Sequence, residues 1–277
     1  VVAAAAASGC IGLALGIESG SEKILREIKK PGTPRIFRRA AETLKDYPQI
    51  NVRALLIIGF PGETLSQIQD TINLCEEMNL DWHNIAILQP WKNTPIYDAM
   101  VDQGLLGEEG KLKGDVSPYQ LGPYSRQRAV EQGKIQQSHY GEKKGGQGLV
   151  DWSDLTRVPK RQELDDIWFY MNVRLNFGKL LSETRQVKLQ QQLTWLEYVL
   201  TKTAPDNAMI AYFYAYLQWK VLGEIDPYLI EMIAARLDES QYWREKFQLF
   251  GLNLRDIEDY NFPKTRLNGT GYQWLNV

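Results

Sequence analysis

Residues 52–64 read VRALLIIGFPGET, an apolar run that leads directly into a glycine-rich turn. A continuous run of aliphatic residues of this length is typical of a parallel strand that is covered on both faces. The turn ends at Thr64, where we expect a helix that continues to Met78. Its apolar side chains at helical spacing are Leu65, Ile68, Ile72 and Cys75. The stretch therefore predicts a buried strand, a tight turn and an amphipathic helix in succession.

The segments on either side repeat this order of elements. Short apolar runs predict further strands at residues 11–17 and 82–88. Segments with apolar residues at helical spacing predict further helices at residues 22–30, 35–47 and 95–103. Thr33 and Pro34 are a good start for a helix, because threonine caps free N–H groups and proline suits the first helical position. Strands that alternate with helices at this spacing indicate an α/β fold with a parallel sheet.

The chain changes character after residue 103. Ten of the 22 glycines lie between residues 104 and 148, which we interpret as a connecting or lid segment; a surface crossing without function is the simpler explanation. From residue 163 onward, apolar and aromatic residues recur at helical spacing, and Asp206 and Asp226 are placed to cap helices. We therefore predict three parts, at residues 1–103, 104–162 and 163–277.

The composition excludes several classes of protein. The 32 Lys and Arg residues nearly balance the 34 Asp and Glu residues, so the net charge is −2 and no positive excess favours nucleic acid as a partner. Two cysteines and two histidines are too few for a disulfide scaffold or a four-ligand Cys/His zinc site. Two thiols without a secretion signal are typical of a cytoplasmic protein.

The apolar run at residues 1–17 predicts neither a signal peptide nor a membrane span. It lacks a starting Met and a basic segment, and it reaches Glu18 too early to cross a bilayer. We interpret it as the end of a helix, a stop at Ser8 and Gly9, and the first strand. A chain that opens inside a helix without a Met is expected to be part of a longer protein.

Two strand ends are the candidate ligand sites, because parallel α/β sheets bind ligands at the carboxyl ends of their strands. Glu18 ends the first strand, and its carboxylate suits ribose hydroxyls or an ammonium group. Capping of the following helix explains Glu18 and its neighbours equally well. At residues 59–64, the N–H groups of the turn are expected to be free for a nucleobase edge or a phosphate.

Three segments together resemble the second half of a radical SAM core domain: GIESGS at 16–21, LIIGFPGET at 56–64 and QPWKNTPIY at 89–97. The resemblance covers about residues 1–103. It is closest to the branch that includes the cobalamin-binding enzymes, such as the anaerobic magnesium-protoporphyrin ester cyclase, and the methylthiotransferases. It implies the last three strands of a partial parallel (β/α) barrel, followed by an all-α C-terminal region.

The resemblance also implies which residues bind S-adenosylmethionine. It implies that the ribose and methionyl parts are contacted at the first strand end, by Glu18 and Ser19. It implies that adenine is contacted at the second strand end, by Ile57, Gly59 and Phe60. Further nucleoside contacts are implied at the third strand end, from Leu88, Gln89 and Pro90. The common form of the second motif has a Glu three residues after Gly59, where this chain has Gly62. Glu63 follows, and we expect it to act as a cap.

The chemistry that the resemblance implies is reductive cleavage of S-adenosylmethionine at a [4Fe–4S] cluster, which gives a 5′-deoxyadenosyl radical. A small-molecule substrate and an electron donor such as flavodoxin or ferredoxin are the implied partners. The family binds its cluster through a Cys-x3-Cys-x2-Cys loop, since three of the irons each need a thiolate. Cys10 and Cys75 match this loop in neither number nor position. We therefore expect the cluster ligands, and any cobalamin domain, to lie outside this chain, which alone is expected to be inactive.

Two alternatives remain open. The first is a methylthiotransferase of the same superfamily, although those enzymes usually end in a small β-barrel rather than in helices. The second is a degenerate core that has no catalytic activity and serves as a binding or assembly module, with its aromatic helices as the partner surface.

Overall fold

The computed structural model describes residues 1–106, 150–160 and 163–263. Three parallel strands form one sheet in the order β1-β2-β3. They are β1 (Gly12–Glu18), β2 (Asn51–Ile58) and β3 (Trp82–Ile87). The helices of this part are α1 (Val2–Ala7), α2 (Glu22–Glu27), α3 (Pro34–Lys45), α4 (Leu65–Met78) and α5 (Pro95–Asp102). The predicted α/β class and the three parallel strands are confirmed.

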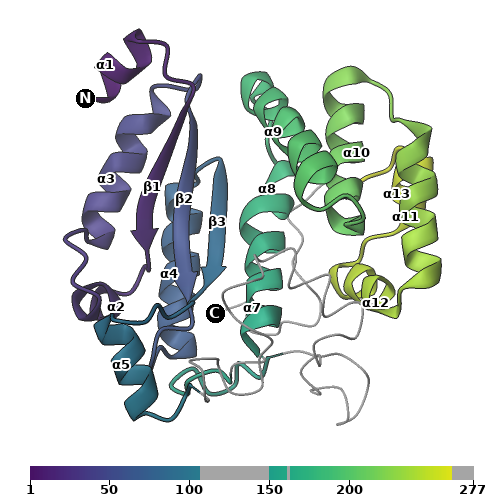
Figure 1. Cartoon of the computed structure of the whole chain (residues 1–277). Coiled ribbons are helices and arrows are strands. Elements are labelled where there is room, and N and C mark those ends of the chain that lie inside the picture. Colours follow the sequence, from purple (N-terminus) through teal and green to yellow (C-terminus); the bar gives the residue numbers. More distant parts are fainter. Residues whose placement is uncertain (107–149, 161–162, 264–277) are drawn as a thin grey trace.

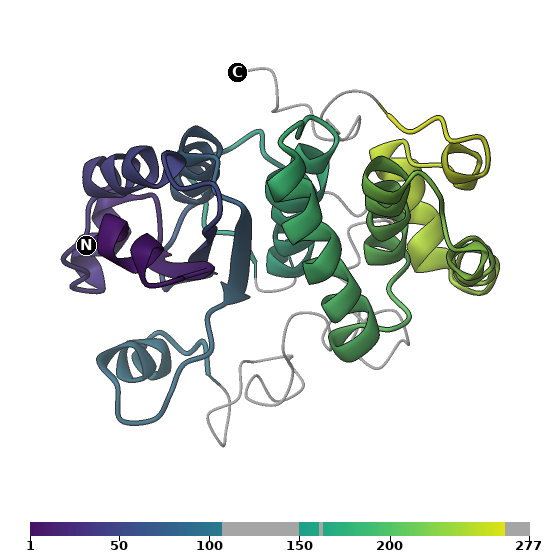
Figure 2. The ribbon, with the colours of Figure 1, turned by 90° about the horizontal axis from the view of Figure 1, so that it is seen from above.

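The C-terminal region is helical, as predicted. Its elements are α7 (Glu163–Asn172), the π-helical turn η3 (Val173–Phe177), α8 (Gly178–Leu180), α9 (Gln186–Tyr198), the π-helical turn η4 (Val199–Thr203), α10 (Ala208–Leu222), α11 (Pro227–Glu239), α12 (Gln241–Phe250) and α13 (Leu254–Glu258). Figures 1 and 2 show this region standing beside β3, while α2 and α5 lie beyond the carboxyl ends of the strands. None of the helices in the described ranges has the length and apolar character needed to cross a membrane.

Local capping explains where several helices begin. The Thr33 hydroxyl accepts a hydrogen bond from the Ile36 N–H, and Pro34 takes the first position of α3, as expected. The predicted cap at Asp206 is wrong: the adjacent Asn207 caps α10 by accepting a hydrogen bond from the Ile210 N–H. Because a cap must stand at a fixed offset from the first free amides, a shift of one residue changes which side chain can do this.

One face of the sheet is covered throughout, and the other is covered by the helical region at Trp82 and Arg53 but is partly exposed in the middle. Alternate residues of β2 (Val52, Ala54, Leu56 and Ile58) are buried in the main hydrophobic core, which also contains apolar side chains of α3 and α4. Side chains that alternate with these point to the opposite face. There Leu55 is 39% exposed, and its neighbours in register, Gly16 of β1 and Asn84 of β3, are also not buried.

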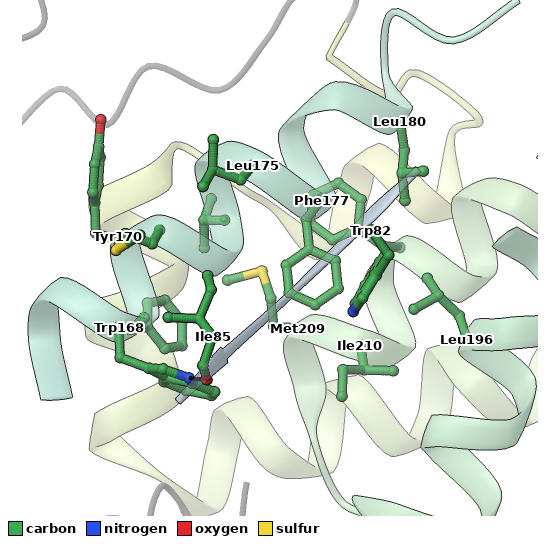
Figure 3. Packing of buried hydrophobic residues seen from close by; sticks show 14 of the residues in the cluster. Trp82, Ile85, Trp168, Tyr170, Leu175, Phe177, Leu180, Leu196, Met209 and Ile210 are labelled. Carbon is green, nitrogen blue, oxygen red and sulfur yellow. Dashed lines mark hydrogen bonds between the residues drawn. The ribbon is translucent and has the colours of Figure 1, made fainter. Parts of the chain in front are cut away.

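The free edge of β3 is closed by side chains of the helical region. The Trp168 indole N–H donates to the Ile85 carbonyl at 2.8 Å, and the Asn176 amide both donates to the His83 carbonyl at 2.9 Å and accepts from the His83 N–H at 2.8 Å. These contacts satisfy backbone groups that would otherwise pair with a further strand. The indole of Trp168 and the ring of Phe177 also pack against β3 (Figure 3).

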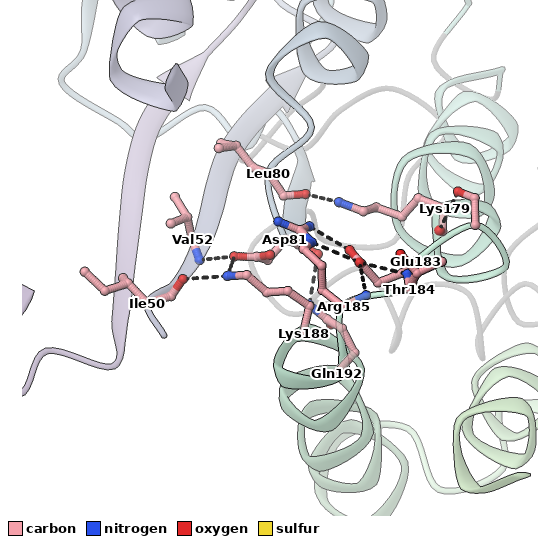
Figure 4. Close-up of polar contacts among 11 residues, drawn as sticks. Ile50, Val52, Leu80, Asp81, Lys179, Glu183, Thr184, Arg185, Lys188 and Gln192 are labelled. Atoms are coloured by element: carbon pink, nitrogen blue, oxygen red, sulfur yellow. Dashed lines mark hydrogen bonds and ion pairs between the residues drawn. The ribbon is translucent and has the colours of Figure 1, made fainter. Parts of the chain in front are cut away.

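The amino ends of the strands are joined to α9 by a buried ion pair (Figure 4). The Lys188 ammonium lies 2.7 Å from the Asp81 carboxylate and donates to the Ile50 carbonyl at 2.8 Å. The same carboxylate accepts a hydrogen bond from the Val52 N–H at 2.7 Å. The Gln192 amide donates to the Asp81 carbonyl at 3.0 Å. The helical region therefore contacts β3 along its edge and the sheet at its amino ends.

Candidate functional site

The carboxyl ends of the three strands meet at one edge of the sheet. Because the strands are parallel and adjacent, Glu18, Gly59 and Leu88 emerge side by side at that edge. Phe60 and Leu88 belong to one small hydrophobic cluster, against which Ile57 packs as a partly buried side chain. The structure thus brings the candidate residues of all three strand ends together.

Glu18 has an unusual backbone and a charged partner. A β-bulge shifts its register against β2, and its φ of 64° lies in the left-handed region that side chains other than glycine rarely adopt. Its carboxylate lies 3.0 Å from the Lys30 ammonium, and the two side chains are 22% and 29% exposed, respectively. A Cβ atom on Gly16 would lie 3.0 Å from both charged atoms, so the ion pair lies directly above Gly16. Backbone strain of this kind is concentrated at functional sites.

Lys30 is a candidate site residue that the sequence analysis did not identify. It lies twelve residues after Glu18, beyond α2, and neither its spacing nor its neighbours distinguish it from a surface lysine. The one feature of the sequence that points to this ion pair is Gly16, because the absence of a side chain there leaves room for the two charged groups. A carboxylate and an ammonium side by side offer an acceptor and a donor to one zwitterionic ligand.

Ser19 is fully buried and contacts other parts of the protein. Its hydroxyl accepts a hydrogen bond from the Ser21 N–H at 3.1 Å and lies 3.2 Å from the Thr71 hydroxyl of α4. The Gly20 N–H donates to the same Thr71 hydroxyl at 2.8 Å. These contacts fix the turn after β1 against α4. A contact between Ser19 and a ligand stays a prediction.

The Glu63 side chain stabilises the turn after β2 by hydrogen bonds to the backbone of the same turn. This side chain is fully buried, and its Oε2 accepts hydrogen bonds from the N–H groups of Gly59 at 2.6 Å and Phe60 at 3.2 Å. Its Oε1 is buried and has no hydrogen-bond partner among the described residues. Burial raises the pKa of the Glu63 carboxyl to about 7, against the opposing effect of the two N–H groups.

The expectation that the N–H groups at residues 59–64 are free is therefore wrong for Gly59 and Phe60. The amides at the start of α4 also have partners: the Leu65 N–H donates to the Arg157 carbonyl at 3.0 Å, and the Ser66 N–H donates to the Leu155 carbonyl at 2.8 Å. Sequence reasoning misses these partners because they lie some ninety residues further along the chain. The turn and the helix after it are thus already satisfied within the protein.

Gly59 is required by two features of the turn. Its φ is +83°, and a Cβ atom at this position would lie 2.6 Å from the Leu164 Cδ1 of α7. Any other residue would be strained by the backbone conformation and would displace the leucine.

The third strand end is largely covered. Leu88 is 9% exposed and Pro90 is also buried, whereas Gln89 is partly exposed. The Met100 side chain of α5 packs with Leu88 in the small hydrophobic cluster. Ile57 is the only one of the apolar candidates at the three strand ends (Ile57, Phe60, Leu88 and Pro90) that is not buried.

The described residues offer no group of three His, Cys, Asp or Glu side chains that can hold a metal ion. The chain as a whole has two cysteines, so it cannot supply three thiolates to an iron–sulfur cluster. Cys75 is buried on α4, and burial raises the pKa of its thiol. These residues do not fit a cluster, whereas the Glu18–Lys30 pair fits the charged groups of an amino acid.

Comparison with known proteins shows what part of this chain is similar to. The sequence model of the radical SAM superfamily matches residues 1–75. Curated relatives include enzymes named tRNA-2-methylthio-N(6)-dimethylallyladenosine synthase; those of Vibrio vulnificus and Vibrio cholerae are each 36% identical over 100 residues, or 36% of this chain and 20% of each relative. The enzyme of the same name from Vibrio parahaemolyticus is 35% identical over 91 residues, or 32% of this chain and 19% of the relative. The match thus spans about a fifth of the length of these relatives.

Proposed function

We propose, from the match of residues 1–75 to the sequence model of the radical SAM superfamily, that this chain is part of an enzyme that binds S-adenosylmethionine at the carboxyl ends of β1, β2 and β3. The observation that carries the proposal is the Glu18–Lys30 ion pair, which lies partly exposed above Gly16 at the strained end of β1. The candidate residues of β2 and β3 lie beside it at the same edge of the sheet.

Each part of the ligand has a chemically suitable partner. The Lys30 ammonium suits the methionyl carboxylate, and the Glu18 carboxylate suits the methionyl ammonium or the ribose hydroxyls. The partly exposed side chain of Ile57 suits a face of the adenine ring. Gly59 and Phe60 shape the turn that borders this position, and residues 88–90 border it on the β3 side.

In this superfamily the bound nucleoside supplies a 5′-deoxyadenosyl radical after reductive cleavage at a [4Fe–4S] cluster. Because this chain has two cysteines, the thiolates for such a cluster must come from elsewhere. The residues of this chain then bind and orient the nucleoside and exclude water around it. Cobalamin dependence, a cytoplasmic location, an electron donor such as flavodoxin or ferredoxin, and membership of a longer protein stay predictions.

A second candidate is a methylthiotransferase that acts on a tRNA nucleoside. The names of the Vibrio relatives favour it, since these enzymes are described as synthases of a methylthiolated tRNA adenosine. The balanced charge of the chain and its helical C-terminal region favour the small-molecule substrate expected from the sequence. A binding module without catalytic activity is the remaining possibility.

Calorimetry with S-adenosylmethionine tests the proposal. We expect Lys30→Met to weaken binding to the chain by about tenfold or more, because it removes a charge-assisted contact. Lys45→Met is the matched control, since Lys45 also pairs with a glutamate but lies exposed on α3, and it should leave the affinity unchanged. A wild-type chain that does not bind S-adenosylmethionine at millimolar concentration would contradict the proposal. Tight, salt-dependent binding of tRNA by the wild-type chain would favour the second candidate.

A further inference from the structure

The side chain of Leu164 in the helical region contacts the turn after β2. Leu164, in the first turn of α7, is 4% exposed, and its Cδ1 lies where a side chain on Gly59 would begin. The contact is therefore made directly to the backbone of the turn. Leu164 lies outside the residues that match the radical SAM superfamily.

A second contact comes from residues 150–160, which we call the strap. Its carbonyl groups at Leu155 and Arg157 accept the N–H groups of Ser66 and Leu65 at the start of α4, at 2.8 and 3.0 Å. These two amides are among the four that a helix cannot satisfy internally at its N-terminus. The strap thus holds the helix that directly follows the turn.

The strap and the start of α7 are joined by an ion pair between Arg157 and Glu163, which we call the clasp. The Arg157 guanidinium contacts both carboxylate oxygens of Glu163, at 2.6 and 2.7 Å, and the Glu163 side chain is fully buried. The Lys160 N–H donates to the same carboxylate at 2.6 Å. Because Glu163 immediately precedes Leu164, this clasp fixes the strap and the start of α7 as one unit.

The turn itself has little intrinsic rigidity. Gly59 and Gly62 both have positive φ values, of +83° and +74°, and glycine restricts its backbone less than any other residue. The side chain of Glu63 holds the turn from within, through the N–H groups of Gly59 and Phe60. From outside, Phe60 packs in the small hydrophobic cluster with Leu88, Leu164 contacts Gly59, and the strap holds the start of α4.

We infer that Leu164 and the strap are positioning elements, through which the helical region sets the place of Gly59 and Phe60 in the nucleoside site. The inference rests on the function proposed above. Leu164 itself contacts the turn and not the ligand. Its loss leaves a cavity beside a turn that contains two glycines, and the turn can then leave the geometry that binds the nucleoside.

Hydrogen exchange of the backbone amides tests the structural half of the inference without any ligand. We expect Leu164→Ala to accelerate exchange at residues 59–66 by about tenfold, because the contacts that hold the turn closed are lost. Leu193→Ala is the matched control, since Leu193 is equally buried (6% exposed) but lies on α9, and it should not change exchange at these residues. Leu164→Met should restore protection. Where the alanine variant does not fold, Leu164→Val and Leu193→Val replace the pair.

Calorimetry with S-adenosylmethionine tests the functional half. Leu164→Ala should weaken the affinity by about tenfold, whereas Leu164→Met and Leu193→Ala should retain it. Unchanged exchange in Leu164→Ala, or the same acceleration in Leu193→Ala, would overturn the inference. Faster exchange with unchanged affinity would overturn the role of Leu164 in nucleoside binding. A wild-type chain that does not bind S-adenosylmethionine contradicts the proposed function, and the exchange data then decide the positioning of the turn alone.

Discussion

Asp81 and Glu63 are both buried carboxyl groups, and they lie at opposite ends of the same sheet. Asp81 precedes β3 at the amino ends of the strands, where its carboxylate accepts hydrogen bonds from the Lys188 ammonium and the Val52 N–H. Glu63 follows β2 at the carboxyl ends, where no counter-charge lies within ion-pair distance among the described residues and one oxygen has no partner. The same chemical group is thus neutralised at one end of the sheet and left uncompensated at the other.

The difference indicates how the two ends divide their roles. At the amino ends, the polar side chains join the helical region to the sheet, and each has a defined partner (Figure 4). At the carboxyl ends, the structure retains a buried acid, a partly exposed ion pair and a glutamate at a positive φ. A buried acid without a counter-charge and backbone strain both reduce stability, and both are typical of a binding site. Mutations at the two ends should therefore affect different properties.

The largest effect on stability is expected at the amino ends. Lys188→Met leaves the Asp81 carboxylate buried without its counter-charge, which should lower the free energy of unfolding by about 3–5 kcal/mol. Urea unfolding measures this loss. Lys202→Met, at an exposed position of η4, is the control and should change stability by about 0.5 kcal/mol or less. A loss below about 1 kcal/mol for Lys188→Met would contradict a stabilising role of this buried ion pair.

Glu63 should make stability depend on pH. Its pKa is raised from 4.5 to about 7 in the folded protein, so between these pH values the unfolded chain loses the proton while the folded chain keeps it. The folded state is therefore penalised progressively as the pH rises from 4.5 to 7, by about 3 kcal/mol in total. Glu63→Gln does not titrate and still offers an oxygen to Gly59 and Phe60.

Relative to the wild type, the Glu63→Gln variant should accordingly gain about 3 kcal/mol of stability between pH 4.5 and pH 8. Urea unfolding of both proteins at several pH values measures the difference, and titrations common to both proteins cancel. A difference that is constant across this range would show that the pKa of Glu63 is not raised in the folded chain.

A third, smaller effect is expected at the edge of β3. Asn176→Leu keeps the approximate volume of the side chain but leaves the N–H and carbonyl groups of His83 without the hydrogen bonds from Asn176, which should cost about 2–3 kcal/mol. Asn73→Leu, at an exposed position of α4, is the control and should change the free energy of unfolding by about 0.5 kcal/mol or less. Equal losses in urea unfolding for the two variants would contradict the closure of this edge by Asn176.

The parts of this structure that follow from short-range patterns could be predicted from the sequence. The strands are rich in apolar residues, and caps such as Thr33 and Asp226 act within three residues of their own position. The adjacency of Glu18, Gly59 and Leu88 also follows, because parallel neighbouring strands end at one edge. Where the short-range pattern is ambiguous by one residue, prediction fails: Asp206 was expected to cap α10, but the adjacent Asn207 does so.

The contacts that define the candidate site in detail could not be predicted. Asn176 bonds to His83 across 93 residues, and only the folded chain brings them together. The strap bonds to Leu65 and Ser66 over a similar separation, so the amides that the sequence suggests are free are in fact satisfied. Lys30 is closer to Glu18 in sequence, but its contact depends on the left-handed backbone of Glu18, which no local pattern indicates.

Lys30→Met is expected to have the smallest effect on stability, and it sharpens the contrast between the two ends. The substitution is the same as Lys188→Met, and each lysine pairs with one carboxylate, at 3.0 and 2.7 Å. Because the Lys30 and Glu18 side chains are 29% and 22% exposed, water and salt screen their attraction, and the free energy of unfolding should fall by about 0–1 kcal/mol. The affinity for S-adenosylmethionine should fall in the same variant. If Lys30→Met instead destabilised the chain as much as Lys188→Met in urea unfolding, the Glu18–Lys30 pair would be part of the structural framework, and its partial exposure would no longer favour a role in binding.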